Sequence, residues 1–296
     1  ISAGTTTNAV FTGLTGMGTP MVREHNGTNT TSTTNWGASA FAYTPPTGLK
    51  RLMTADRSAP TVIDPSAFFK AKAYEGNGTA IGSGGNAVAV GFQPDFVWIK
   101  NRDQDDDHRL FDAIRGAQNY LESNSQIDQN QATDRSLTYP AGGYAEMLNA
   151  FTSTGFNLGD NVSVNTNNES YVAWCWKAGG SGSSDDTGGI TVTRSTASHQ
   201  GFSICKGTST SGTQNFAHGL GAKPEFVILR DLEDGSQHFQ VQHKDVNTNM
   251  KDITTLGLNR NLDAGSSTDW WGAEPTSTLQ YFTTNQVTGT NDFVCY

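Results

Sequence analysis

The chain contains two related stretches that decide its fold. Residues 91–100 read GFQPDFVWIK, and residues 221–230 read GAKPEFVILR. Both follow one pattern at an offset of 130 positions (221 − 91): Gly-x-x-Pro, an acidic residue, Phe-Val, two apolar residues and a basic residue. His108 and His238 keep the same offset. A pattern that recurs at such a distance indicates an internal duplication.

Each copy of this pattern predicts a buried β-strand. Pro94 and Pro224 cannot donate a hydrogen bond to a neighbouring strand, so each is expected just where a strand begins. The apolar runs 96–99 and 226–229 lack the alternation of a strand with one solvated face. Such a run suits a central strand that is covered on both faces, or one that packs against a neighbouring module.

The composition predicts an all-β chain. Charged residues make up only 16% of the sequence, and its 33 glycines separate short runs of Val, Ile, Phe, Trp and Tyr. Short apolar runs between Gly, Asn and Ser turns are typical of antiparallel sheets. We therefore predict tandem antiparallel β-sandwiches with little helix.

The duplication and the composition together divide the chain into four segments. Residues 178–189 have the polar, Gly/Ser-rich composition of a flexible linker. We expect a first β-sandwich repeat at 65–177 and a second, shorter one at 190–296. Residues 1–64 are expected to be a separate β-rich segment, either the tail of another domain or an assembly arm.

The charge balance argues against some partners. The net charge is −9 and the isoelectric point is about 5.0, so a nucleic acid is not an expected partner. No apolar stretch approaches the roughly 20 residues that a membrane-spanning helix needs, so we predict no membrane insertion.

Three cysteines are too few for a disulfide framework and lack metal-ligand spacing. Cys175, Cys205 and Cys295 each lie in an apolar, strand-like context, and two of them belong to the aromatic stretches that close the copies, YVAWCW at 171–176 and DFVCY at 292–296. We expect buried free thiols. A Cys205–Cys295 bridge stays open as the alternative.

Two groups of polar residues carry weak signals of chemistry. The acidic run Asp105, Asp106 and Asp107 offers hard oxygens for a calcium ion, but it lacks the order of an EF-hand loop, and a solvated turn is the expectation. Next to it, His108, Asp112 and Arg115 suggest an acid–base set or, as we expect, a structural ion pair at a turn. We predict no catalytic residue, no resident metal and no cofactor.

Aromatic residues are the better candidates for a binding surface. Trp270 and Trp271 lie in the polar, loop-like stretch 266–272, where indole rings would stack on sugars or contact a partner. The alternative is that both cap the core of a sandwich. Trp174 and Trp176 share one face of a strand, so core or inter-module packing is expected for them.

Several stretches resemble a repeat that is common in virion proteins of marine bacteriophages. The resemblance covers residues 91–102, 108–116, 155–156 and 171–177, and it is typical of tail fibres and other appendages of cyanophages and related phages. Residues 35–50 resemble the closing segment of the SPRY-like domain that often precedes this repeat. For the two sandwiches, the resemblance implies the jelly-roll or concanavalin-like type. It also implies a virion surface, and so an extracellular location, and it supplies no catalytic residues.

These observations predict a structural protein rather than an enzyme. We expect a tail fibre, tail appendage or capsid-surface component that contributes to assembly and host adsorption. Its expected partners are other virion proteins and copies of itself, in a homo-oligomer. One alternative is a carbohydrate-binding module that recognises host surface glycans, and another is a polysaccharide depolymerase.

Overall fold

The computed structural model describes residues 64–129, 147–197, 201–254 and 256–296. All of them belong to the second of two compact units, residues 60–296. The strands in them pair antiparallel, and the helical elements are single turns, as the sequence predicts. Those turns are η2 (Pro65–Ala67), η3 (Ile81–Ser83), α1 (Val162–Asn165) and η5 (Met250–Asp252). The expected N-terminal segment and its SPRY-like stretch lie outside the described residues.

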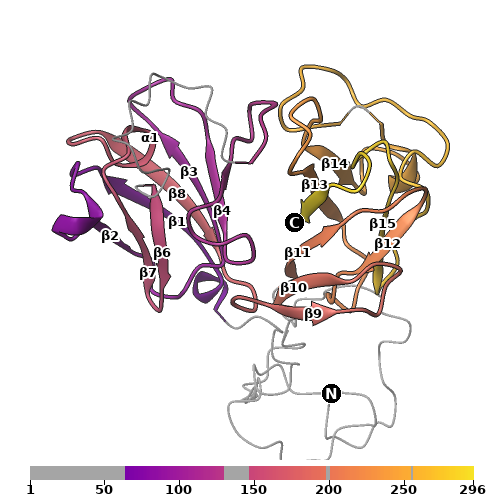
Figure 1. The fold of residues 1–296 in the computed structure, drawn as a ribbon, viewed down its shortest axis with the longest axis horizontal. Helices are drawn as coiled ribbons and strands as arrows, with labels where there is room; N and C mark the ends of the chain where they lie inside the picture. Colours follow the sequence, from indigo (N-terminus) through magenta and orange to yellow (C-terminus); the bar gives the residue numbers. More distant parts are fainter. Residues whose placement is uncertain (1–63, 130–146, 198–200, 255) are drawn as a thin grey trace, which may run out of the picture. The chain divides into compact units, whose positions relative to one another are not determined.

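The first sandwich consists of two antiparallel sheets (Figure 1). The strands of its larger sheet are β1 (Phe69–Glu75), β3 (Phe96–Asn101), β4 (Arg109–Asp112), β5 (Tyr120–Leu121) and β8 (Ser170–Trp176). Those of its smaller sheet are β2 (Asn86–Ala89), β6 (Leu148–Thr152) and β7 (Gly155–Leu158). The strand orders are β1-β8-β3-β4-β5 and β2-β7-β6.

The second sandwich repeats this plan with different additions. The strands of its larger sheet are β9 (Ser183–Asp185), β10 (Val192–Ala197), β11 (Phe202–Thr208), β13 (Phe226–Asp231), β14 (Gln240–His243) and β16 (Asp292–Cys295). Those of its smaller sheet are β12 (Gln214–Ala217) and β15 (Leu279–Phe282). The order β11-β16-β13-β14 matches β1-β8-β3-β4, and the pair β12-β15 matches β2-β7. The duplication seen in the sequence is therefore a duplication of strand topology.

The segment between the copies is not linker throughout. Strand β9 lies inside residues 178–189 and pairs with β10, Val192 standing opposite Asp185. Arg194 also binds the Asp185 carboxylate at 2.5 Å. The sequence did not predict this strand, because β9 is short, mostly exposed and lies in a Gly/Ser-rich stretch. The larger sheet of the second sandwich thus begins before residue 190.

The register also corrects the alignment of the two closing stretches. In the first copy Trp98 stands opposite Trp174, whereas in the second Ile228 aligns with Tyr296. Residues 171–174 therefore correspond to 293–296, two positions away from the alignment that superposes the cysteines. The matched pairs are Tyr with Phe, Val with Val, Ala with Cys and Trp with Tyr.

Each sandwich has its own apolar core between its two sheets. In the first, Tyr171, Ala173 and Cys175 alternate along β8 and point into this core. In the second, the corresponding inward residues of β16 are Phe293 and Cys295. Fully burying one such large side chain contributes about 1.5–3 kcal/mol.

The repeated strand β3 is covered on both faces, as its unbroken apolar run predicts. Val97 and Ile99 belong to the core of the first sandwich, while Phe96 and Trp98 belong to a third cluster on the outer face of the same sheet. This third cluster includes Ile228 and Tyr296 of the second sandwich. The outer faces of the two larger sheets thus pack against each other.

Candidate functional site

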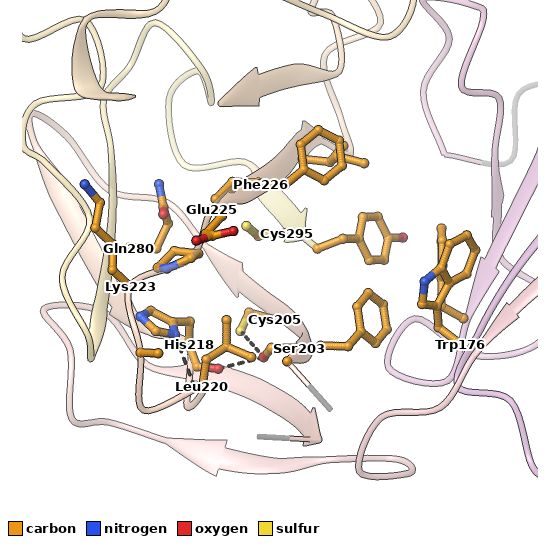
Figure 2. Close-up of a pocket in the computed structure, with 18 of the residues that line it drawn as sticks. Trp176, Ser203, Cys205, His218, Leu220, Lys223, Glu225, Phe226, Gln280 and Cys295 are labelled. Carbon is orange, nitrogen blue, oxygen red and sulfur yellow. Dashed lines mark hydrogen bonds between the residues drawn. The ribbon is translucent and has the colours of Figure 1, made fainter. Parts of the chain in front are cut away.

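A cavity of about 550 Å³ lies where the two sandwiches meet (Figure 2). Its apolar wall is mostly aromatic. The first sandwich contributes Phe96, Trp98 and Trp176, and the second contributes Phe202, Phe226 and Tyr296. This volume falls in the range of small-molecule pockets, which are typically apolar with a few placed polar groups.

The aromatic side chains of this wall contact one another across the junction. The ring of Phe96 lies 4.5 Å from that of Tyr296 and 6.1 Å from that of Phe202, centroid to centroid. Trp176 stacks on Phe202 at 6.2 Å. Such contacts stabilise the junction beyond the area they bury.

His218 forms part of the polar wall, and its ring nitrogens both have partners. The backbone N–H of Leu220 donates to Nδ1 at 3.2 Å, and Nε2 lies 3.2 Å from the carbonyl oxygen of Thr276. A neutral ring protonated at Nε2 satisfies both contacts. Burial lowers the pKa of His218, so the neutral form is the one expected near neutral pH.

The two thiols of the second sandwich also line the cavity. Cys205 stands opposite Cys295 on neighbouring strands, and both thiols are free. Burial raises the pKa of Cys205 to about 12 and that of Cys295 well above its ordinary value. Protonated buried thiols are poor nucleophiles. The prediction of buried free thiols is confirmed, for Cys175 as well, and the alternative Cys205–Cys295 bridge is not formed.

The charged residues at the cavity have partners of their own. Lys223 forms an ion pair with Glu274, and Glu225 forms one with Lys244 at 2.8 Å. Glu225 and Lys244 are well exposed, so this pair adds little to stability.

A buried ion pair of the first sandwich joins the two sandwiches. Asp112 and Arg115 are fully buried, with Nε 2.5 Å from Oδ2. The hydroxyl of Tyr296 donates to the same Oδ2 at 2.6 Å. His108 is not part of this group, since its Nδ1 accepts from the Trp98 indole N–H at 2.7 Å. The structural ion pair expected at this turn is therefore confirmed, and the acid–base set is not assembled.

Arg230 makes a second polar link, which sequence reasoning missed. It is fully buried and donates from Nη2 to the carbonyl oxygen of Ile127, in the first sandwich, at 2.6 Å. Close by, the side chain of Asn259 donates to the carbonyl oxygen of Ser125 at 2.9 Å. The one available signal was the basic residue that ends each copy of the repeated motif.

Comparison with known families decides what kind of chain this is. Residues 64–296 match the model of a family described as a domain of unknown function, DUF7483. The chain belongs to the DUF7483 family. The match runs through both sandwiches without a break. No curated protein and no solved structure matches the chain.

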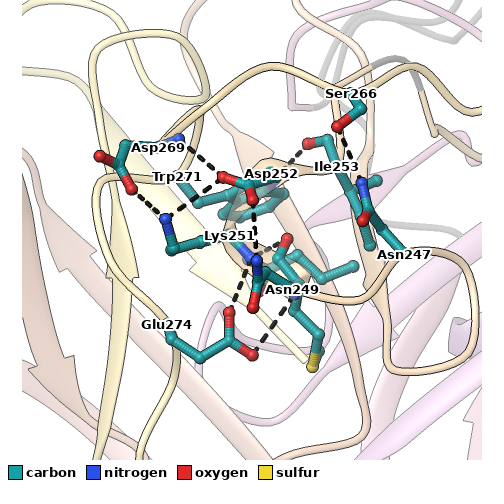
Figure 3. Close-up of polar contacts among 11 residues, drawn as sticks. Asn247, Asn249, Lys251, Asp252, Ile253, Ser266, Asp269, Trp271 and Glu274 are labelled. Atoms are coloured by element: carbon teal, nitrogen blue, oxygen red, sulfur yellow. Dashed lines mark hydrogen bonds and ion pairs between the residues drawn. The ribbon is translucent and has the colours of Figure 1, made fainter.

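The DUF7483 region does not present Trp271 to solvent, so the predicted binding role is wrong for this residue. Trp271 is 1% exposed and belongs to the second core. Its indole N–H donates to the carbonyl oxygen of Ile253 at 2.8 Å (Figure 3). Trp270 is partly buried and packs against the same core. Capping of the core, the alternative weighed for both tryptophans, fits this arrangement.

Polar contacts hold the Trp271 loop against η5 (Figure 3). The backbone N–H of Trp271 donates to the carbonyl oxygen of Lys251 at 2.9 Å, and that of Asp269 donates to Oδ1 of Asp252 at 2.8 Å. Glu274 accepts from the backbone of Lys251 at 3.1 Å. The polar residues around the tryptophans thus hold this loop against η5.

The acidic run is not gathered into a ligand set. Asp105 is exposed, Asp106 is buried and accepts from the Asn101 amide at 2.7 Å, and Asp107 accepts from the Asn124 amide at 2.5 Å. In the part of the DUF7483 chain that the structure covers, no three His, Cys, Asp or Glu side chains form a group suited to a metal ion. None of the helices described there has the length and apolar character needed to span a bilayer.

Proposed function

We propose that this chain is a structural component of a bacteriophage virion, as a tail fibre, tail appendage or capsid-surface protein. In this role it contributes to assembly and host adsorption, together with copies of itself and other virion proteins. The virion surface is inferred from the sequence resemblance. The structural role is supported by one observation above all: the Asp112–Arg115 pair is buried and binds Tyr296 of the other sandwich.

This observation matters because these residues were the strongest candidates for acid–base chemistry. A general acid or base must reach the proton that it transfers. Asp112 instead accepts from Arg115, from Tyr296 and from the backbone N–H of Ile114. A carboxylate in this position stabilises the junction between the two sandwiches.

The test is to locate the protein in particles. An antibody raised against the full chain should label purified virions in immunogold electron microscopy, and peptides of the chain should appear when those virions are digested for mass spectrometry. Mass photometry of the isolated chain should give one defined oligomer. Detection in lysates of infected cells but never in purified particles would contradict the proposal.

The two alternatives drawn from the sequence keep separate tests. The carbohydrate-binding alternative expected sugars to stack on Trp270 and Trp271, but Trp271 is buried. Glycan-array binding that Trp270→Ala removes, with the unfolding midpoint unchanged, would restore it. Release of reducing ends from host polysaccharide by the purified chain would favour the depolymerase.

A further inference from the structure

The two copies differ in how far their central strands are paired. In the first copy, β8 pairs with β1 as far as Phe69 and with β3 as far as Phe96, both of them opposite Trp176. In the second copy, the pairing of β16 reaches Cys205 on β11 and Ile228 on β13. The first residues of β11 and β13 therefore lie on either side of a gap in their sheet.

In the first copy, an aromatic side chain occupies the position that corresponds to this gap. Trp174 corresponds to Tyr296, so Trp176 corresponds to a strand position two residues further along (176 − 174). The ring of Trp176 lies 4.9 Å from that of Phe69 and 5.2 Å from that of Phe96, centroid to centroid. The first copy thus packs an indole between two phenylalanines of the flanking strands.

The second copy has the same two phenylalanines on its flanking strands. The register places Phe202 where the first copy has Phe69, and the repeated motif places Phe226 where it has Phe96. Both line the cavity, and Phe226, which Figure 2 labels, is 50% exposed. An aromatic ring between them would remove apolar surface from water, which is favourable.

The backbone beside the gap is oriented to pair with a further strand. Ile228 exchanges two backbone hydrogen bonds with Tyr296, at 2.8 and 2.9 Å. Every second residue of a strand directs its N–H and C=O groups to the same side, so Phe226 directs its own toward the gap. In such a strand the residue before the aromatic one points to the opposite face. In the first copy that preceding residue is Cys175, which is small and belongs to the core.

We propose that this gap receives an extended segment of a partner protein that carries a tryptophan or tyrosine preceded by a small residue. Its aromatic ring packs between Phe202 and Phe226, as Trp176 packs between Phe69 and Phe96, and its backbone pairs with β13. Addition of a strand to an unpaired part of a sheet is an established mode of peptide recognition. This partner site goes beyond the structural role proposed above, and either proposal can fail without the other.

The exposed residues of the chain favour a different protein over a second copy as the partner. In the part of the chain that the structure describes, the exposed large hydrophobic side chains are those of Phe69, Phe226, Val246 and Leu262. None of them is a tryptophan or a tyrosine. A second copy therefore does not offer the required aromatic side chain from these residues.

A matched set of peptides tests the ring and the strand separately. The parent is the tetrapeptide Ala-Trp-Lys-Ala, which follows residues 175–178 with alanine in place of the cysteine and carries a fluorescent dye at its carboxyl end. Its binding to the full chain is measured by fluorescence anisotropy. Replacing its tryptophan with alanine should weaken binding at least about tenfold, because the indole provides most of the apolar area that is buried.

Methylation of the tryptophan nitrogen in the peptide backbone keeps the ring but removes the N–H that would bind the Phe226 carbonyl oxygen. This change should weaken binding about fivefold, the effect of one hydrogen bond. Three results overturn the proposal: no binding of the parent peptide, equal binding of the alanine peptide, or equal binding of the methylated one.

A pair of chain variants tests the location. Phe226→Ala removes one side of the proposed site and should weaken binding of the parent peptide about tenfold, with little change in the unfolding midpoint, because the side chain is half exposed. Phe69→Ala is the matched control. Phe69 is 41% exposed but flanks a position that Trp176 already fills, so this variant should bind the peptide normally.

Equal effects of the two variants would place the peptide elsewhere and overturn the proposal. Mass photometry of the chain alone tests the remaining occupant. A dimer that the parent peptide dissociates would identify a second copy as the partner and overturn the assignment to a different protein.

Discussion

The two copies place the same phenylalanine in opposite environments. Phe96 and Phe226 occupy the same position of the repeated motif, and each begins its strand. Phe96 is 3% exposed beneath Tyr296 and Phe202, whereas Phe226 is 50% exposed. The position in the motif gives both phenylalanines the same strand conformation. Their burial differs because Tyr296 and Phe202 pack against Phe96.

The residues opposite these phenylalanines differ in the same way. Asp112 stands opposite Phe96, and His243 stands opposite Phe226. Asp112 is buried and receives the Tyr296 hydroxyl, while His243 is half-buried and lies edge-on to Phe226 at 6.0 Å. In this contact the first copy thus provides the buried hydrogen-bond acceptor, Asp112, and the second copy provides the donor, Tyr296.

Truncating each phenylalanine in turn gives the largest contrast between the copies. Phe96→Ala should destabilise the chain by about 4 kcal/mol, because it leaves a hole among buried aromatic rings. Phe226→Ala should cost less than about 1 kcal/mol, because half of that side chain is already in water. Urea unfolding followed by circular dichroism measures both. Equal losses would mean that the two positions are equally covered in solution.

Removing the charge of Asp112 tests the acceptor side of this contact. Asp112→Asn should cost about 3 kcal/mol, because the buried guanidinium of Arg115 loses its counter-charge. The exposed pair of Glu225 and Lys244 is the control, and Glu225→Gln should leave the urea midpoint unchanged. A similar midpoint for both variants would argue against a buried pair.

Removing one hydroxyl tests the other side of the same contact. Tyr296→Phe should cost about 2 kcal/mol, since a hydrogen bond to a buried carboxylate is lost while the ring contacts remain. Burial raises the pKa of Tyr296 well above its ordinary value, so the hydroxyl stays protonated in the folded chain. In the Asp112→Asn background the same substitution should cost clearly less. Additive losses of stability in this double-mutant cycle would mean that the two residues do not interact.

The smallest expected effect is a dependence of stability on pH. Burial lowers the pKa of His218 from its ordinary value of 6.5, so below about pH 6.5 the unfolded chain takes up a proton that the folded chain does not. Stability should therefore fall between pH 7.5 and 5.5, measured as the urea midpoint. His108 and His238 are shifted the same way, so His218→Gln should reduce this fall without abolishing it. A midpoint that rises toward pH 5.5 would contradict the assignment.

Local patterns were enough to predict much of this fold. Pro94 and Pro224 mark where β3 and β13 begin, and the unbroken apolar run predicted a strand covered on both faces. The free cysteines followed from their apolar neighbours. Each of these features depends on residues close together in the chain, where periodicity and turn chemistry act.

The junction and the cavity depend on contacts that no local pattern encodes. Tyr296 reaches Asp112 across 184 positions of sequence, and Gln280 is paired with Gln242 from another sheet. The binding prediction for Trp271 rested on its polar neighbours, which are typical of a solvated loop. In the structure, hydrogen bonds connect this loop to Lys251 and Asp252. Polar composition does not distinguish a solvated loop from one that hydrogen bonds hold against the rest of the fold.

The back-to-back junction lacks the symmetry that a two-fold pairing of the copies would have. Both copies use the outer face of the same part of the sheet, β3 with β8 in the first and β13 with β16 in the second. In a two-fold contact, equivalent residues have equivalent surroundings. Phe96 and Phe226 do not, since they are 3% and 50% exposed, so the two copies are not interchangeable at the junction.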